Sequence, residues 1–257
     1  MKKSTAPLGN HQKCWLWGRI AVTETLAAGR WPVLELLLSD ALGDDKISTA
    51  RDQAHALATP VSVVSKSKLT RLARTDHHQG YLAKMGQYPY VDWRDILDLC
   101  DAKTSSNPLM IILDGIQDPQ NLGAIIRSTE VFGAGGVFIS AANQVPITTA
   151  VARSSAGAVN RVNIARCDLP ALASEMTQSG FKTIAACETA EDSLYNCDLA
   201  GPVTIVIGNE ARGIRPELLE LCSYRVSIEQ HGEINSLNAA TAASIFMYEA
   251  RRHCNVH

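Results

Sequence analysis

A polar segment, D-P-Q-N-L-G-A-I-I-R at residues 118–127, stands where an apolar strand ends and a helix is predicted to begin. Pro119 suits the first helical turn, and Asp118 before it suits the N-cap. The backbone N–H groups that such a helix leaves free, beside Asn121 and Gly123, predict an anion or ligand site. Arg127 lies inside the helix, where it either serves that site or is an exposed helix charge.

A second polar turn follows an apolar strand in V-T-I-V-I-G-N-E-A-R-G-I at residues 203–214. Gly208 would let a ligand approach the backbone closely, because glycine has no Cβ. Glu210 and Arg212 follow directly and are either part of a site or a surface ion pair. Charged turns at the ends of buried strands are where α/β proteins place their sites, which favours the first interpretation.

A third segment runs from Ile228 to Tyr248 and ends in an alanine-rich stretch. Ser236 is expected to cap a long helix over 236–252, with Leu237 and Asn238 at its opening. The alanines that follow would let another backbone pack very close. An ordinary tightly packed helix explains the alanines, but it does not explain the polar residues around Leu237.

The elements that must position these segments follow from apolar periodicity. Before residue 90, helices are predicted at 17–29, 48–58 and 67–74, and strands at 33–39, 60–64 and 81–85. After residue 107, strands are predicted at 109–113, 136–140, 182–187, 203–208 and 224–228, and helices at 121–132, 150–159, 216–222 and 236–252. This alternation predicts an α/β fold with a parallel sheet covered on both faces.

The chain of 257 residues suits two modest domains. We expect a flexible N-terminus at 1–12, a small α/β domain at 13–90, a linker at 91–107 and the larger domain at 108–257. The first 90 residues hold 12 Lys and Arg against 7 Asp and Glu, a net charge of +5, and the remainder holds 12 against 19, a net charge of −7. A basic first domain suits phosphate.

The basic residues suited to contact the phosphates of a nucleic acid gather in one stretch, with one more beside the first predicted helix. They are Lys66, Lys68, Arg71, Arg74 and Arg19. The alternative is a solvated helix face. His77 and His78, next to Gln79-Gly80, are expected to contact RNA or to face solvent.

Composition excludes several classes of protein. No apolar run approaches the ~20 residues of a membrane span, and the polar start of the chain argues against a secretory signal. Seven cysteines without a C-x-x-C pair indicate reduced, mostly buried thiols and a cytoplasmic protein, with no spacing that supports a metal site.

Taken together and in this order, the three segments resemble the SpoU-TrmH family of RNA methyltransferases. The resemblance rests on residues 118–127, on I-G-N-E-A-R-G-I (207–214) and on S-L-N (236–238), with S-S-A-G-A (154–158) between them. It covers roughly residues 109–252. G-R-I-A-V-T-E-T-L (18–26) and H-Q-G (78–80) resemble, less specifically, the N-terminal RNA-binding domain of many members, which is similar to a ribosomal-protein fold.

The resemblance implies a trefoil knot in the C-terminal domain, a homodimer formed through that domain, and S-adenosylmethionine bound in the knot. No periodicity of the sequence reveals a knot. The implied reaction is methylation of a ribose 2′-hydroxyl. The implied catalytic residues are Arg127, Asn121, Glu210, Ser236 and Asn238, and those implied at the cofactor are Gly208, Ile228, Leu237, Asn209 and Ile207.

The family's catalytic arginine matches Arg127. A guanidinium is normally protonated and is a poor base, so the family proposal has it act together with the substrate phosphate. The sequence departs from the family at Glu229-Gln230, where a proline usually follows the isoleucine matched by Ile228. This departure puts the cofactor's surroundings in doubt more than the catalytic residues.

The RNA-binding domain favours large-subunit rRNA as the substrate, and a tRNA ribose methyltransferase is the alternative. A non-catalytic RNA-binding protein of the same fold is a further alternative, disfavoured by four retained residues, Asn121, Arg127, Glu210 and Asn238. A dinucleotide-binding oxidoreductase is disfavoured because the glycine cluster at 133–136 follows a predicted helix and precedes a strand, the reverse of the order that its fingerprint requires.

Overall fold

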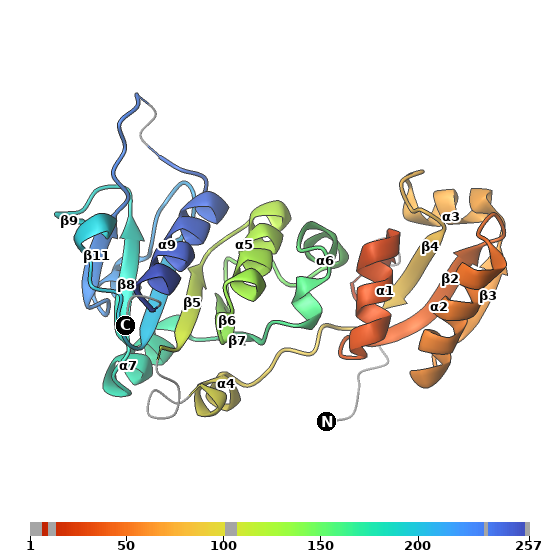
Figure 1. Ribbon diagram of the computed structural model, residues 1–257, viewed down its shortest axis with the longest axis horizontal. Helices are drawn as coiled ribbons and strands as arrows, with labels where there is room; N and C mark the ends of the chain where they lie inside the picture. Colours follow the sequence, from red (N-terminus) through yellow and green to blue (C-terminus); the bar gives the residue numbers. More distant parts are fainter. Residues whose placement is uncertain (1–6, 10–13, 101–106, 234–235, 255–257) are drawn as a thin grey trace. The chain divides into compact units, whose positions relative to one another are not determined.

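The computed structural model describes residues 7–9, 14–100, 107–233 and 236–254. The chain divides into two compact units. Unit 1 comprises residues up to Pro89 together with Pro146–Arg161, and unit 2 comprises Tyr90–Val145 together with Val162 onward. Figure 1 shows the ribbon of both, coloured along the sequence.

Unit 1 is a small α/β domain built on a mixed sheet. Among the described residues, its four strands lie in the order β1-β4-β2-β3, with β2 and β3 parallel and the other pairs antiparallel. The strands are β1 (Trp15–Trp17), β2 (Val33–Ser39), β3 (Val61–Val64) and β4 (Tyr81–Met85). The helices are α1 (Arg19–Ala28), α2 (Asp44–Ala56) and α3 (Lys66–Ala73). The strands predicted at 33–39 and 81–85 are confirmed, whereas β1 was not predicted because three residues show no period.

A segment from the middle of the chain completes unit 1. It contains α6 (Thr149–Ser154) and the 3-10 turn η1 (Ala158–Asn160). The Arg153 guanidinium stacks 4.2 Å from the centre of the Trp17 ring, and the Tyr88 hydroxyl donates to the Val159 carbonyl over 2.7 Å. The helix predicted at 150–159 is wrong beyond Ser154, because Ala156 and Gly157 adopt left-handed backbone angles, with φ of 51° and 87°.

Unit 2 carries a seven-stranded sheet within its described residues, in the order β7-β6-β5-β10-β8-β11-β9, and the paired strands are all parallel. The strands are β5 (Leu109–Asp114), β6 (Gly136–Ser140), β7 (Ile164–Cys167), β8 (Lys182–Cys187), β9 (Asp192–Ser193), β10 (Val203–Gly208) and β11 (Tyr224–Ser227). The helices are α4 (Trp93–Leu99), α5 (Pro119–Val131), α7 (Leu169–Gln178), α8 (Pro216–Leu219) and α9 (Ala239–Cys254), with a 3-10 turn η2 (Leu194–Asn196). The predicted α/β class is confirmed.

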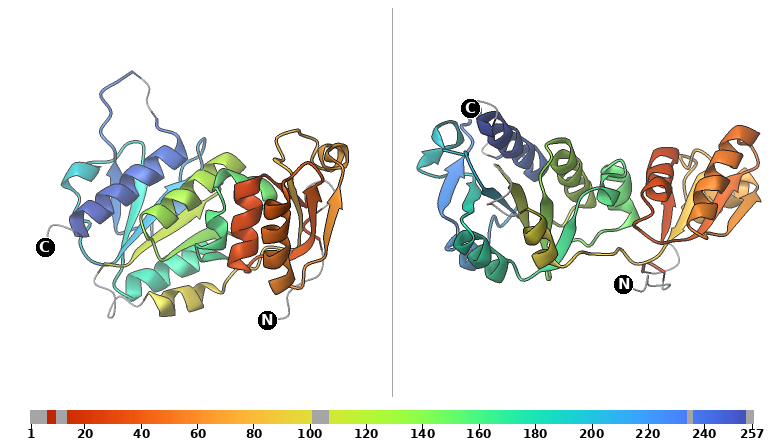
Figure 2. Two further views of the ribbon diagram at one scale, coloured as in Figure 1. Left: turned by 45° about the vertical axis from the view of Figure 1, so that its right-hand side comes forward. Right: turned by 60° about the horizontal axis from the view of Figure 1, so that its bottom comes forward.

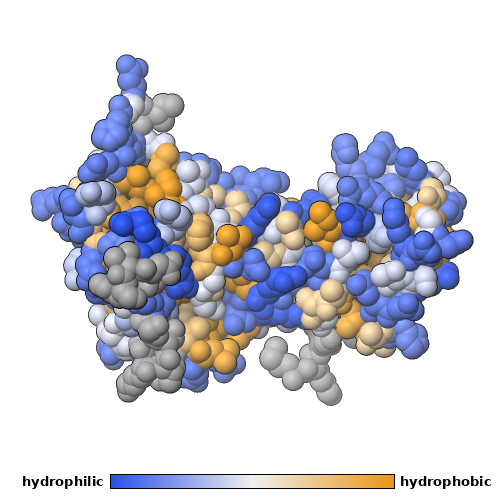
Figure 3. All heavy atoms as spheres, in the orientation of Figure 1, coloured by the Kyte–Doolittle hydropathy of each residue, from blue (hydrophilic) through white to orange (hydrophobic). Residues whose placement is uncertain are grey.

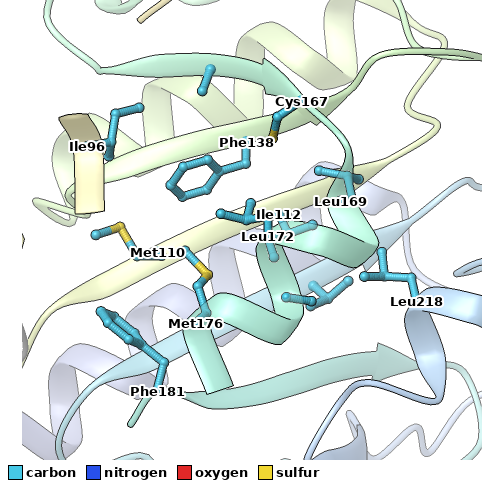
Figure 4. Close-up of a cluster of buried hydrophobic side chains, with 13 residues drawn as sticks. Ile96, Met110, Ile112, Phe138, Cys167, Leu169, Leu172, Met176, Phe181 and Leu218 are labelled. Carbon is cyan, nitrogen blue, oxygen red and sulfur yellow. The ribbon is translucent and has the colours of Figure 1, made fainter. Parts of the chain in front are cut away.

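Helices cover both faces of the large sheet, as the fully apolar strands require. Helices α5 and α9 lie side by side on one face in both views of Figure 2, and the hydroxyls of Ser128 and Ser244 bond across them at 2.8 Å. On the other face, α4 and α7 pack on a cluster that includes Ile96, Met110 and Phe138, all fully buried (Figure 4). The core therefore fixes the strand ends that carry the polar segments.

The expected flexible N-terminus and the expected linker lie only partly within the described residues. The expected flexible N-terminus, 1–12, lies outside them except at 7–9, where the Leu8 N–H donates to the Met85 carbonyl over 3.0 Å. The expected linker, 91–107, lies outside them at 101–106. Its described part contains α4, whose Ile96 is buried in the core of unit 2.

The six cysteines that the structure describes are free thiols, two of them buried and four half-buried. Burial raises the pKa of Cys167 and of Cys222 to about 12. These thiols therefore stay protonated and unreactive. In the described part of the chain, no helix is long and apolar enough to cross a membrane.

Candidate active site

The carboxyl ends of β5 and β10 lie next to each other at the middle of the large sheet, where Gly208 pairs with Asp114. The chain runs outward from β5 through β6 to β7 and later returns on the other side of β5 with β10. Such a reversal of strand order opens a crevice at the carboxyl ends of parallel strands, which is where α/β proteins bind ligands.

Gly208 is required by a close backbone approach. A Cβ built there would lie 2.3 Å from the Gly213 carbonyl carbon and 2.4 Å from the Ile214 nitrogen. Asn209 and Gly213 exchange backbone hydrogen bonds of 3.0 and 2.9 Å, so the chain turns back on itself directly after β10. We call residues 208–215 the cofactor loop.

Three side chains from three distant segments form one row of hydrogen bonds. Asn238 Nδ2 donates to Asn121 Oδ1 over 2.9 Å, and Asn121 Nδ2 donates to Glu210 Oε1 over 2.6 Å. These contacts join residues 117 and 89 positions apart in the sequence. Each amide has one orientation that satisfies its partners, so the row fixes both asparagines.

The row is anchored at the start of α9, and here the expectation for Ser236 is corrected. Asn238 Oδ1 accepts from the N–H groups of Ala240, at 2.9 Å, and Thr241, at 3.3 Å. Asn238 is therefore the N-cap. The helix begins at Ala239, whereas Ser236 precedes it and is exposed.

A cavity of about 410 Å³ opens beside this row. The cofactor loop forms one wall, and the segments after β8 and β11 and the first turns of α9 form the others. Predicted cofactor residues that line it are Ile207, Gly208, Asn209, Ile228 and Leu237. Apolar side chains that sequence reasoning missed at this place are Ile214, Leu219 and Phe246. A cavity of this size, lined by both apolar side chains and polar groups, suits a nucleoside-sized ligand.

The departure at Glu229-Gln230 is accommodated without a proline. Gln230 lines the cavity beside Ile228. The Glu229 carboxylate accepts a hydrogen bond from the Ser193 hydroxyl over 2.9 Å. The glutamate therefore has a polar partner next to β9.

Arg127 does not take part in the row of hydrogen bonds formed by Asn238, Asn121 and Glu210. Its side chain is exposed on α5, and it makes no hydrogen bond or ion pair with the residues that the structure describes. Asn121 and Glu210, which the resemblance also implies as catalytic residues, bond to each other.

The residues predicted to contact RNA lie in unit 1. Lys66, Lys68, Arg71 and Arg74 are all exposed on or directly after α3, and Arg19 is exposed at the start of α1, where its N–H donates to Gln79 Oε1 over 2.9 Å. The interpretation of His78 is wrong, because its ring is only 1% exposed and its Nδ1 accepts from the Gly80 N–H. Burial, and then the charge of Lys66, lower its pKa. His77 is exposed.

Residues 15–91 match the family described as RNA 2′-O ribose methyltransferase substrate binding, and residues 108–248 match the SpoU rRNA Methylase family. Fold and matched families together define an RNA ribose methyltransferase. The chain belongs to the SpoU rRNA Methylase family, as the resemblance of its motifs predicted.

Curated relatives extend over nearly the whole chain. The putative TrmH family tRNA/rRNA methyltransferase YacO of Bacillus subtilis is 30% identical over 96% of this chain and 98% of that protein. The 23S rRNA (guanosine-2′-O-)-methyltransferase RlmB of Shewanella oneidensis is 31% identical over 92% and 96%.

Solved structures share the fold. An AdoMet-bound rRNA methyltransferase from Sinorhizobium meliloti superposes with a TM-score of 0.79 at 24% identity, covering 94% of this chain and 88% of that one. The SpoU methyltransferase AviRb from Streptomyces viridochromogenes, in complex with AdoMet, gives 0.76 at 24% identity over 93% and 90%.

Proposed function

We propose that this protein transfers the methyl group of S-adenosylmethionine to a ribose 2′-hydroxyl of large-subunit rRNA. The observation that carries the proposal is the cavity of about 410 Å³ whose wall, the cofactor loop, also holds Glu210 in the polar row. A cofactor cavity and a polar row that share one loop are suited to bring a methyl donor and a hydroxyl together.

The residues present fit S-adenosylmethionine. The cavity lining combines the apolar side chains of Ile214, Leu219 and Phe246, which suit an adenosyl group, with the polar groups of the cofactor loop. When bound, the cofactor supplies an electrophilic sulfonium methyl group. Ile207, Gly208, Asn209, Ile228 and Leu237 would hold it.

The chain's own residues must orient the ribose and manage its proton. Asn121 and Asn238 present fixed amides, and Glu210 has a second carboxylate oxygen beyond the one that accepts from Asn121. We assign Arg127 to the substrate phosphate, where its protonated fork can bridge phosphate and ribose. Ser236 would contact the same substrate from the loop before α9.

The preference for rRNA rests on unit 1 and on a relative. Residues 15–91 match the substrate-binding family, unit 1 carries the exposed basic helix α3, and the Shewanella oneidensis relative is a 23S rRNA methyltransferase. The Bacillus subtilis relative carries a tRNA/rRNA description, so tRNA is the second candidate.

We also propose that the protein is a homodimer formed through unit 2. On α5 and α9, Val131, Ile245 and Tyr248 are 67%, 36% and 59% exposed, and the space-filling view shows apolar side chains in this region (Figure 3). The alanines expected to let another backbone pack close are not available to a partner subunit, since Ala239, Ala240 and Ala243 are buried within the chain.

The trefoil knot that the resemblance implies is part of the same proposal. The segments after β8, β10 and β11 and the start of α9 all line one cavity, which agrees with a threaded chain around the cofactor.

Mapping ribose methylation in cells that lack the protein tests the substrate. We expect one 2′-O-methyl group to disappear from large-subunit rRNA and to be restored by purified protein with S-adenosylmethionine. Loss of a tRNA methyl group instead would favour the second candidate, and loss of neither would contradict the proposed reaction.

A further inference from the structure

A buried carboxylate lies at the carboxyl end of β5, next to the polar row but outside it. The Asp114 side chain is only 3% exposed, and both of its oxygens are used: Oδ1 accepts from Arg215 Nε over 2.8 Å and Oδ2 from the Arg215 backbone N–H over 2.9 Å. A buried carboxylate is costly unless it is paired and hydrogen-bonded. The pair therefore strongly favours one position of Arg215, a residue 101 positions away.

A second attachment lies at the other end of the cofactor loop. Asn209 Nδ2 donates to the Gly115 carbonyl over 2.8 Å, and Asn209 Oδ1 accepts from the N–H groups of Ala211 and Arg212 at 2.9 and 3.1 Å. Gly115 itself has a φ of 82°, which favours glycine. The loop is thus fastened to the end of β5 at both of its ends.

Between the two attachments lie the parts of the loop that matter for the reaction. Residues 208–214 form a wall of the cavity, and Glu210 reaches Asn121 on α5. A shift of Arg215 away from β5 would move the cavity wall and Glu210 together. Neither Asp114 nor Arg215 lines the cavity.

We propose that Asp114 is a positioning residue for methyl transfer, acting through Arg215 and the cofactor loop. It sets the cavity wall against the cofactor and the Glu210 carboxylate against Asn121. This inference rests on the proposed function, since it gives the loop a role in that reaction.

Asp114→Asn tests the inference, because it removes the charge and sets a donor against one of the two Arg215 donors, Nε or the backbone N–H. We expect the affinity for S-adenosylmethionine, measured by calorimetry at a temperature where the variant is folded, to fall by about tenfold. We expect kcat for RNA at saturating cofactor to fall by about 10- to 100-fold, the usual effect of a misplaced catalytic group.

Asp198→Asn is the control for removing an ion-paired carboxylate elsewhere in unit 2, at a side chain that is 72% exposed. Asp198 pairs with Lys182 Nζ at 2.5 Å in the same unit, and neither residue lines the cavity. We expect cofactor affinity and kcat to stay unchanged in this variant. Equal losses in both variants would mean that the effect is not specific to the Asp114 pair, and the inference would be wrong.

A double-mutant cycle separates positioning from general stability. If Asp114 acts on kcat through Glu210, Asp114→Asn should lower kcat much less in a Glu210→Gln background than alone. If Asp114→Asn lowers kcat by the same factor with and without Glu210→Gln, Asp114 does not act on kcat through Glu210. Should Asp114→Asn not fold, Arg215→Gln, at a residue whose side chain is 45% exposed, takes its place with the same expected directions.

Measurements on the wild-type protein distinguish failure of the proposed function from failure of the positioning role. If it neither binds S-adenosylmethionine nor methylates RNA, the proposed function fails. If it does both and the folded Asp114 and Arg215 variants match it, only the positioning role fails.

Discussion

Arg127 is the one arginine of residues 118–127, and its exposed guanidinium is available to a substrate. We expect Arg127→Ala to fold and to bind S-adenosylmethionine normally while losing methyl transfer by ~100-fold or more. Arg127→Lys keeps the charge but loses the planar fork, so it should also lose most activity. Single-turnover methylation of an rRNA fragment, with cofactor affinity measured in parallel, checks both variants. Near-normal turnover of Arg127→Ala at saturating RNA would show that Arg127 is only a helix charge.

Asn238 has two tasks that a substitution can separate, since its Oδ1 caps α9 and its Nδ2 donates to Asn121. Asn238→Asp keeps the cap but cannot donate to Asn121, so we expect near-normal stability and about tenfold slower methyl transfer. Asn238→Ala loses both tasks and should cost a further ~1 kcal/mol of unfolding free energy. Urea denaturation and single-turnover rates distinguish the variants. Equal stability losses in both would contradict the capping role.

At the scale of elements, α3 is a short helix that can be changed without disturbing the large sheet. Ser65 caps it by accepting from the Lys68 N–H, and Leu69 buries its inner face, so its basic side chains are free to meet phosphate. We expect replacement of Lys66, Lys68, Arg71 and Arg74 by Ala to weaken RNA binding and to flatten its dependence on salt, by a slope of about 0.7–0.9 per lost phosphate contact. Cofactor affinity should not change.

A pair of variants in unit 1 provides the control for charge alone. Lys46 and Arg51 are exposed on α2, and changing both to Ala removes as much charge as changing Lys66 and Lys68. RNA titrations over a range of salt concentrations should show the larger loss for the α3 pair. Equal losses would mean that the net charge of unit 1, and not α3, attracts RNA.

At the scale of the whole molecule, the exposed apolar residues of α5 and α9 should decide assembly. We expect Val131→Glu combined with Tyr248→Glu to convert a dimer into a folded monomer, because two buried unpaired charges would oppose association. Light scattering of the full chain measures the mass. Leu99→Glu, at a residue of α4 that is 72% exposed, should leave the dimer intact. A wild-type monomer would contradict the assembly proposal.

The full chain is needed for that test, because the segment 146–161 belongs to unit 1. Val151 and Val159 are fully buried there, and Asn160 Nδ2 donates to Thr25 Oγ1 over 3.0 Å. A truncation that removes the N-terminal residues would uncover this segment and confuse loss of assembly with loss of folding.

Strand bounds and helix caps were largely predictable from the sequence, because they depend on residues close together in the chain. The strands at 33–39, 136–140, 182–187 and 203–208 were predicted with the bounds that the structure has, because buried strands are short, mostly apolar segments. Asp118 caps α5 as expected, since a cap depends on residues within one turn. Strand β7 and helix α7 were missed, because I-A-R-C is too short to show a period and Pro170 obscures the helix that follows.

Only tertiary structure decided which polar residues meet. The motifs predicted Asn121, Glu210 and Asn238 as separate site residues. Their hydrogen bonds join residues 89 and 117 positions apart in the sequence. The neighbouring positions of β5 and β10 in the sheet bring these residues together. The same holds for Asp114 and Arg215, which carry no local signal beyond a charge at a strand end. The sequence pattern pointed to Ser236 as the N-cap of α9, whereas the structure has Asn238 there, and its Nδ2 also donates to the distant Asn121. Short-range patterns fix caps and strands, whereas contacts between distant segments arise only when the packed sheet sets where each strand ends.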